Sequence, residues 1–197
     1  MRDERSPERP AVDTLSWLQE SDGTARWFSL DRASDAWTRD LVGDRADLPA
    51  SLGLGRDVLT GPARALDLPR PTILVDEDET AGGRRRLAVT VRSERGAPVL
   101  RAFLRSDSAM TGLRVGGAPV DAASLSAGGV RLALYGFEDA AVRMELELDG
   151  EGPVEIEVLD QAWGLPADQL PRPRPPDVIP RPGWLTDSTF TVARQRL

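Results

Sequence analysis

Hydrophobic and polar residues alternate with a period of two along most of the chain after Pro71. The two clearest runs are "AAVRMELELDG" and "GPVEIEVLD". Their apolar positions are Val142, Met144, Leu146 and Leu148 in the first run and Val154, Ile156 and Val158 in the second, and Arg and Glu fill the positions between them. A strand directs successive side chains to opposite faces. The pattern therefore predicts half-buried antiparallel strands, with one face on a core and the other in water.

Several shorter runs before these two show the same alternation. They are "TILVDED", "RRLAVTVRS", "APVLRAFLRS", "MTGLRVGGAPV" and "GGVRLALYGF", and Gly-rich turns join them. Many short strands separated by turn signals are typical of β-sandwiches. No helical segments alternate with the strands, which argues against a parallel Rossmann-type sheet. The sequence therefore predicts a mainly β fold. We expect an antiparallel β-sandwich of the jelly-roll or immunoglobulin-like kind, with one or two short helices.

The first part of the chain predicts a β-hairpin. Two strand-like runs in "VDTLSWLQESDGTARWFSL" flank Asp22-Gly23, and Asp-Gly is a strong hairpin signal. Trp17 then lies across from Trp27 or Phe28, depending on the register. A short helix is expected next, in "SDAWTRDLVGD", where Ser or Asp can cap its first turn and Gly can end it.

Residues 44–70 are rich in Gly, Pro and Leu and have no clear period. This composition predicts a loop with one helical turn at most. The charged start, residues 1–11, is interpreted as a flexible lead-in or linker. We therefore expect a single β-sandwich domain over residues 12–197.

Residues 171–182 form a connector rich in Pro and Arg, "PRPRPPDVIPRP". Proline lacks a backbone N–H and is excluded from helix interiors and most ladder positions, so polyproline II geometry is expected. At about 3.1 Å per residue, a dozen such residues can travel roughly 35 Å along a surface. The connector leads to a last strand, "DSTFTVARQRL", with Phe190 and Val192 directed inward. The alternative interpretation of "PRPRPP" is an SH3-type ligand.

The segment around the connector predicts a structural latch, which we define as the contacts that fix residues 160–184 to the sandwich. Asp160 and Gln161 reach a turn where their side chains can bond backbone groups. Trp163 and Trp184 are expected to anchor the two ends of the connector. The last strand then covers an otherwise open sheet edge.

Four residue types are missing from the chain, and three of these absences exclude a kind of chemistry. There is no Cys, His, Lys or Asn, and all 25 basic residues are Arg, a bias typical of a GC-rich genome. Without Cys there is no disulfide, thiolate nucleophile or zinc–thiolate site. Without His the commonest metal ligand and general base are missing, and without Lys there is no Schiff-base chemistry. No cofactor is therefore expected.

The net charge of −7 argues against nucleic acid as a partner, because binding phosphates requires a basic face. The acidic run Asp76–Glu79 could bind calcium, but it lacks the spacing of an EF-hand loop. We interpret it as part of a solvated turn before Gly82-Gly83. No apolar stretch is long enough to span a membrane, and the charged start does not have the pattern of a signal peptide.

Five Trp residues stand beside only one Tyr and four Phe. Trp17, Trp27 and Trp37 are candidates for stacking on a ligand such as a sugar ring. The alternative is that they belong to the core, where Trp is common. A glycoside hydrolase with paired carboxylates is a further alternative, although sequence cannot place two carboxylates across a cleft. Glu145, Glu147, Glu155 and Glu157 alternate on strands and are expected to form a wet face.

Three segments resemble one protein family. They are "DTLSWLQESDGTARWFSLDRASDAWTRDLVG", "LDQAWGLP" and "PRPPDVIPRPGWLTDSTFTVARQRL". They are similar to the C-terminal extracytoplasmic domain of membrane-anchored zinc aminopeptidases, the group of endoplasmic-reticulum metallopeptidase and vacuolar membrane protease. In that family a zinc exopeptidase domain and several transmembrane helices precede a β-rich domain. Its two-zinc site uses His, Asp and Glu, and this chain has no His, so no metal ligand is carried over.

The resemblance implies a non-catalytic, extracytoplasmic accessory domain of a membrane protein. Its role would be structural support, substrate gating or interaction, with the peptidase domain and transmembrane segments as partners in cis. The alternative is a β-sandwich module that binds a peptide or glycan, and a carboxylate-based glycoside hydrolase is the third hypothesis.

Overall fold

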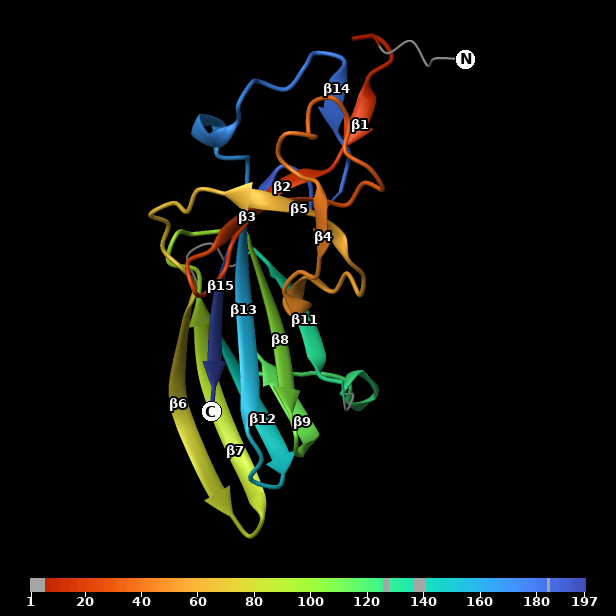
Figure 1. Cartoon of the computed structure of the whole chain (residues 1–197). Coiled ribbons are helices and arrows are strands. Elements are labelled where there is room, and N and C mark those ends of the chain that lie inside the picture. The colour runs from red at the N-terminus through yellow and green to blue at the C-terminus, as the bar shows by residue number, and fades with distance from the viewer. Residues whose placement is uncertain (1–5, 126–127, 137–140, 184) are drawn as a thin grey trace. The chain divides into compact units, whose positions relative to one another are not determined.

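A computed structural model describes residues 6–125, 128–136, 141–183 and 185–197. It confirms the mainly β fold, with three short 3₁₀ turns and no α-helix in these residues: η1 (Ala50–Leu52), η2 (Ala122–Ser124) and η3 (Ala167–Gln169). No helix in the described part of the chain has the length and apolar character needed to cross a membrane. The strands, labelled in Figure 1 where there is room, are β1 (Ala11–Asp13), β2 (Leu15–Gln19), β3 (Ala25–Ser29), β4 (Asp44–Ala46), β5 (Val58–Ala63), β6 (Thr72–Ala81), β7 (Arg84–Arg92), β8 (Val99–Ser106), β9 (Ala109–Val115), β10 (Ala118–Pro119), β11 (Val130–Tyr135), β12 (Val142–Asp149), β13 (Val154–Trp163), β14 (Val178–Pro180) and β15 (Ser188–Arg196).

The chain forms two compact units. Unit 1 contains Met1–Leu48, Leu54–Asp67 and Ala162–Phe190, and unit 2 contains Pro49–Gly53, Leu68–Gln161 and Thr191–Leu197. Strands β13 and β15 each contribute residues to both units. The expectation of a single domain over residues 12–197 therefore stays a prediction.

Unit 2 is built from two sheets whose inner faces share one core. One sheet has the strand order β10-β9-β12-β7-β6, and the other contributes β11, β8, β13 and the end of β15. The strand pairs β9–β10, β8–β11, β7–β12, β9–β12, β8–β13 and β6–β7 are antiparallel. The core residues come from alternate positions of both sheets: Leu87, Val89, Val91, Leu100, Ala102, Leu104, Leu113, Val130, Val142, Met144, Leu146, Leu148, Val154, Ile156 and Val158. The period-two pattern thus correctly predicted the buried positions of β12 and β13.

Unit 1 contains the predicted hairpin. Strands β2 and β3 pair antiparallel, and Trp17 lies opposite Trp27 in their register. At the turn, the side chain of Asp22 accepts hydrogen bonds from Thr24, and Gly23 has a φ of 93°, which explains why Gly stands there. Unit 1 also contains a parallel pair, β1 with β14. Strand β14 lies inside the connector, so this part is a short strand instead of polyproline II.

The prediction of a short helix after the hairpin was wrong, although the residue that caps its first turn was predicted correctly. Asp35 Oδ1 accepts hydrogen bonds from the backbone N–H groups of Trp37 and Thr38, both at 2.8 Å. Residues 36–41 nevertheless form only turns. The N–H of Gly43 bonds the carbonyl of Thr60 in β5 at 3.0 Å, so the chain leaves the turn to join a neighbouring strand.

The prediction of a loop over residues 44–70 was also wrong, because this segment contains the strands β4 and β5. Gly61 and Pro62 in the middle of β5 gave the segment its loop-like composition. Gly is needed there because an added Cβ at Gly61 would lie 2.0 Å from the carbonyl oxygen of Leu41. The close approach of two backbones, and not a turn, explains this glycine.

The acidic run Asp76–Glu79 lies in strand β6 and not in a turn. Two of its carboxylates are hydrogen-bonded as follows: Asp76 accepts from Thr90 and Arg143, and Asp78 makes two hydrogen bonds of 2.7 Å with Arg85. Within the described residues there is no group of three or more acidic side chains that could hold a metal ion. Since β6 ends its sheet, the charges and the bulge after Val75 protect an exposed edge.

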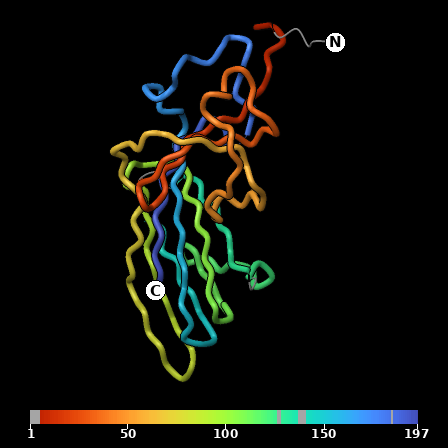
Figure 2. The backbone as a smooth tube through the Cα atoms, in the orientation of Figure 1, coloured from red at the N-terminus to blue at the C-terminus, as the bar shows by residue number. Residues whose placement is uncertain are grey.

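The last strand begins where it was predicted. Phe190 and Val192 are fully buried, as expected. Within unit 2, the end of β15 lies beside β13, where Val154 and Leu197 exchange backbone hydrogen bonds. The expectation that this strand covers an open sheet edge stays a prediction. Figure 2 traces the chain from β13 through the long excursion of the connector and back into β15.

Candidate functional site

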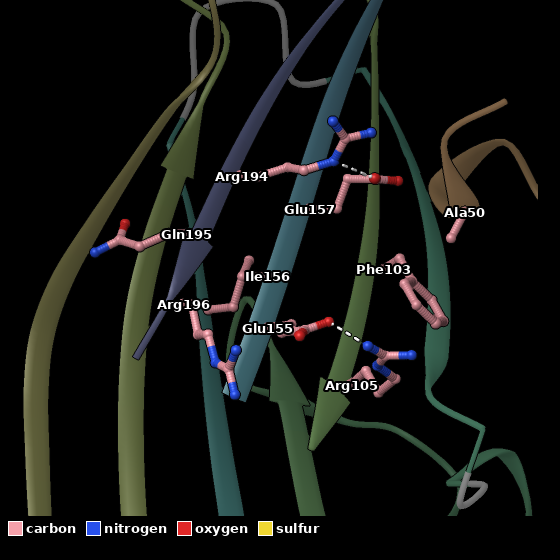
Figure 3. A pocket seen from close by; sticks show the side chains of 9 residues that line it. All are labelled: Ala50, Phe103, Arg105, Glu155, Ile156, Glu157, Arg194, Gln195 and Arg196. Atoms are coloured by element: carbon pink, nitrogen blue, oxygen red, sulfur yellow. Dashed lines mark hydrogen bonds and ion pairs between the residues drawn. The ribbon is translucent and has the colours of Figure 1, made fainter. Parts of the chain in front are cut away.

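The outer face of the sheet formed by β8, β13 and β15 in unit 2 carries an open, charged hollow of about 510 Å³. Figure 3 shows its lining, which comes from η1, β8, β13 and β15: Ala50, Phe103, Arg105, Glu155, Ile156, Glu157, Arg194, Gln195 and Arg196. Ile156 belongs to the core, and its neighbours Glu155 and Glu157 point the other way because successive side chains alternate. The same alternation that builds the core therefore places these charges together.

Strand register aligns the charged side chains of the hollow. Arg105 in β8 lies directly opposite Glu155 in β13, and their side chains form an ion pair of 2.6 Å. On the other side of β13, Arg194 Nε donates to Glu157 Oε2 at 2.8 Å. Reciprocal hydrogen bonds between Val154 and Leu197, of 3.0 and 2.9 Å, fix the end of β15 beside β13.

Glu157 is held from a second direction by η1. The backbone N–H and the hydroxyl of Ser51 each donate to Glu157 Oε1 at 2.7 Å. The side chain of Glu157 is only 11% exposed, whereas that of Glu155 is 45% exposed. The predicted wet face of Glu155 and Glu157 is thus wrong for Glu157, because η1 and Arg194 cover it.

An aromatic ring forms the β8 side of the hollow. Phe103 is half-buried, and the guanidinium carbon of Arg131 lies 4.8 Å from its ring centroid. Arg131 Nε in turn donates to the carbonyl of Ala50 at 2.8 Å. This contact fixes η1 at the rim of the hollow, so the site combines charged groups with one apolar surface.

Asp160 was predicted to bond backbone groups at a turn, but its carboxylate is buried within unit 2 and bonds side chains. Ser93 Oγ and Thr191 Oγ1 each donate to it at 2.7 Å, and Arg95 forms an ion pair with it at 2.8 Å. Gln161, also fully buried, accepts from Arg101 at 3.4 Å. Burial lowers the pKa of Arg101. The bond to Thr191 ties the last strand to β13, which is a structural role.

The expected tryptophan anchors of the latch need correction. Trp163 is 57% exposed, so it cannot serve as a buried anchor for the connector, and Trp184 lies outside the described residues. Trp17, Trp27 and Trp37 are at most 2% exposed and belong to the core of the structure. Because stacking on a sugar requires an exposed ring face, these three rings do not form the ligand platform that was a candidate.

The described connector is anchored in unit 1 by arginine. The guanidinium of Arg174 lies 4.6 Å above the ring of Trp37, and the indole N–H of Trp37 donates to the carbonyl of Arg172 at 3.4 Å. Arg174 also binds both carboxylate oxygens of Asp187 and reaches Asp13 at 3.2 Å. A half-buried guanidinium between two carboxylates was missed in the sequence. The only available signal was the regular spacing of Arg between prolines.

The buried carboxyl group of Asp13 in unit 1 has a strongly raised pKa. Its side chain is 2% exposed, and its Oδ2 has no hydrogen-bond partner among the described residues. Burial raises the pKa of Asp13 from its ordinary 3.8 to about 7, which Arg174 partly opposes and the nearby charge of Asp187 reinforces. Folding therefore favours the protonated form of this carboxyl.

This pKa predicts how Asp13 contributes to stability as the pH changes. Between 3.8 and about 7 the unfolded chain releases the proton while the folded chain keeps it, so this contribution to stability falls as the pH rises and is lost above 7. We expect the wild type to lose more free energy of unfolding than Asp13→Asn between pH 5 and pH 8, measured by urea denaturation. If the free energy of unfolding changed equally with pH in the two proteins, the raised pKa of Asp13 would be contradicted.

Comparisons with known proteins do not assign this chain to a family. No protein-family model matches it, and no curated protein matches it either. The resemblance to membrane-anchored zinc aminopeptidases stays a prediction, and the function is proposed from the described side chains.

Proposed function

We propose that this chain is a non-catalytic accessory domain that acts by binding, with the hollow of unit 2 as its binding site. The observation that carries this proposal is that both carboxylates of the hollow are bonded to neighbouring side chains. Glu155 is paired with Arg105, and Glu157 is held by Arg194 and Ser51. General acid–base catalysis needs a carboxylate within reach of the substrate's proton. Carboxylates paired with guanidinium and hydroxyl groups instead form a pattern of charges on the surface, which suits recognition.

The sequence resemblance supports the same kind of role. In a membrane-anchored zinc aminopeptidase, a terminal extracytoplasmic β-domain would act beside the peptidase domain in structural support, substrate gating or interaction. A module that binds a peptide or glycan independently of a peptidase is the second candidate. The open hollow, with Phe103 beside charged groups, favours it because such sites combine apolar surface with a few polar groups.

Binding in the hollow can be tested without knowing the ligand. Ala50→Trp places a large side chain at the rim and changes no charge. Wild type and variant would be applied to random-peptide and glycan arrays, with thermal melting as a check on folding. We expect specific ligands of the wild type to be lost by the folded variant. Ligands that bind both proteins equally would place binding elsewhere and overturn the proposal.

The non-catalytic part of the proposal has its own test. The purified chain would be incubated with aminoacyl p-nitroanilides and excess zinc, and p-nitroaniline release would be followed by absorbance. We expect no release above the buffer rate, since the chain has no His to form the family's zinc site. Release that disappears with a chelator would contradict a purely accessory role.

A further inference from the structure

The hollow has more positive charge than its own carboxylates neutralise. Its lining contains Arg105, Arg194 and Arg196 against Glu155 and Glu157, in a chain whose net charge is −7. Arg196 is exposed and forms no ion pair with the described residues. A guanidinium in this position can bind an incoming carboxylate through two parallel hydrogen bonds.

Two exposed guanidinium groups lie on either side of Glu155. Figure 3 shows Arg105 on the β8 side and Arg196 on the β15 side. Neighbouring strands are about 4.8 Å apart, so these two groups start from backbones separated by roughly 10 Å. The Arg105–Glu155 pair is itself exposed, with side chains 52% and 45% accessible, and such pairs are weak enough to exchange partners. A ligand with spaced carboxylates can therefore bind Arg196 and compete for Arg105.

The acidic residues of the hollow make a peptide with separated carboxylates a better ligand than a densely charged polyanion. Glu155 and Glu157 would repel a densely charged polymer such as a sulfated glycan, because like charges across an interface are unfavourable. A peptide separates its carboxylates and offers backbone N–H donors to these glutamates. It also supplies apolar side chains, for which Phe103 provides a surface.

We propose that the hollow binds a short acidic peptide segment, with carboxylates on Arg196 and Arg105 and an apolar side chain against Phe103. This inference rests on the proposed function and names the ligand class of the same site.

The probe is a fluorescein-labelled hexapeptide that alternates Glu with Leu, and binding is measured by fluorescence anisotropy at low salt. We expect Arg196→Glu to weaken binding by about tenfold or more and Arg196→Gln to have a smaller effect. The matched control is Arg92→Glu, the same charge change at an exposed position of β7 in the other sheet of unit 2. It should change the affinity less than about twofold, since a distant exposed charge is screened.

Three results would overturn the inference. They are an absence of saturable binding of the hexapeptide, equal weakening by Arg196→Glu and Arg92→Glu, and tighter binding of a sulfated oligosaccharide that Ala50→Trp abolishes. The first or third result would leave the proposed function standing if array ligands still require an open hollow. If array ligands instead bind Ala50→Trp as well as the wild type, the proposed function itself is contradicted.

Discussion

Arg174→Ala should destabilise unit 1 by about 3–5 kcal/mol, the usual cost of removing one partner of a buried ion pair. The Arg174 side chain is 19% exposed and lies between Asp13, which is 2% exposed, and Asp187, which is 28% exposed. Removing the guanidinium leaves these carboxylates without their cation, and it uncovers the ring of Trp37. Urea denaturation followed by tryptophan fluorescence would measure the loss.

Arg172→Ala is the matched control, in the same connector. The Arg172 side chain is 49% exposed and pairs at 3.7 Å with Asp40, which is 63% exposed. Its carbonyl, which accepts from Trp37, is kept in the variant. Exposed pairs contribute about 0–1 kcal/mol, so this variant should remain near the wild type. Equal losses for the two variants would mean that Arg174 is not the anchor of the connector.

Asp160→Ala should cost a similar amount, about 3–5 kcal/mol, but in unit 2. The carboxylate is fully buried and is the shared acceptor of Ser93, Arg95 and Thr191. Its loss removes the charge that faces Arg95, whose side chain is 12% exposed. Because the Thr191 hydroxyl also loses its 2.7 Å bond to Asp160 and keeps only the 3.3 Å contact with the carbonyl of Pro69, we expect faster amide exchange over Thr191–Leu197, measured by mass spectrometry.

Glu155→Ala is the control for this prediction. It removes the acid at the second position of β13, from an ion pair whose two side chains are about half exposed. We expect at most about 1 kcal/mol and unchanged exchange in Thr191–Leu197. If Asp160→Ala behaved in the same way as this control, the buried network would not be what holds the last strand.

For the connector, the sequence predicted the path of the chain but not the side chains that anchor it. Its prolines correctly indicated a non-helical path, and the last strand with Phe190 and Val192 directed inward was confirmed. Trp163 and Trp184 were predicted as the anchors, but Trp163 is exposed and Trp184 lies outside the described residues. The structure instead uses the charge of Arg174, because a guanidinium can bond two carboxylates while it also covers an aromatic ring.

The sequence by itself determined the mainly β class, most strands of unit 2 and the hairpin that places Trp17 opposite Trp27. These features depend on alternation and turn residues, which act between neighbours in the chain. Only the tertiary structure decided that β5 is a strand, that Arg174 reaches Asp13 across 161 positions, and that Ser51 covers Glu157 across 106 positions. The sequence contains each of these side chains but not their distances. The partner of a buried charge, and the hollow that such partners line, are set by which distant strands become neighbours.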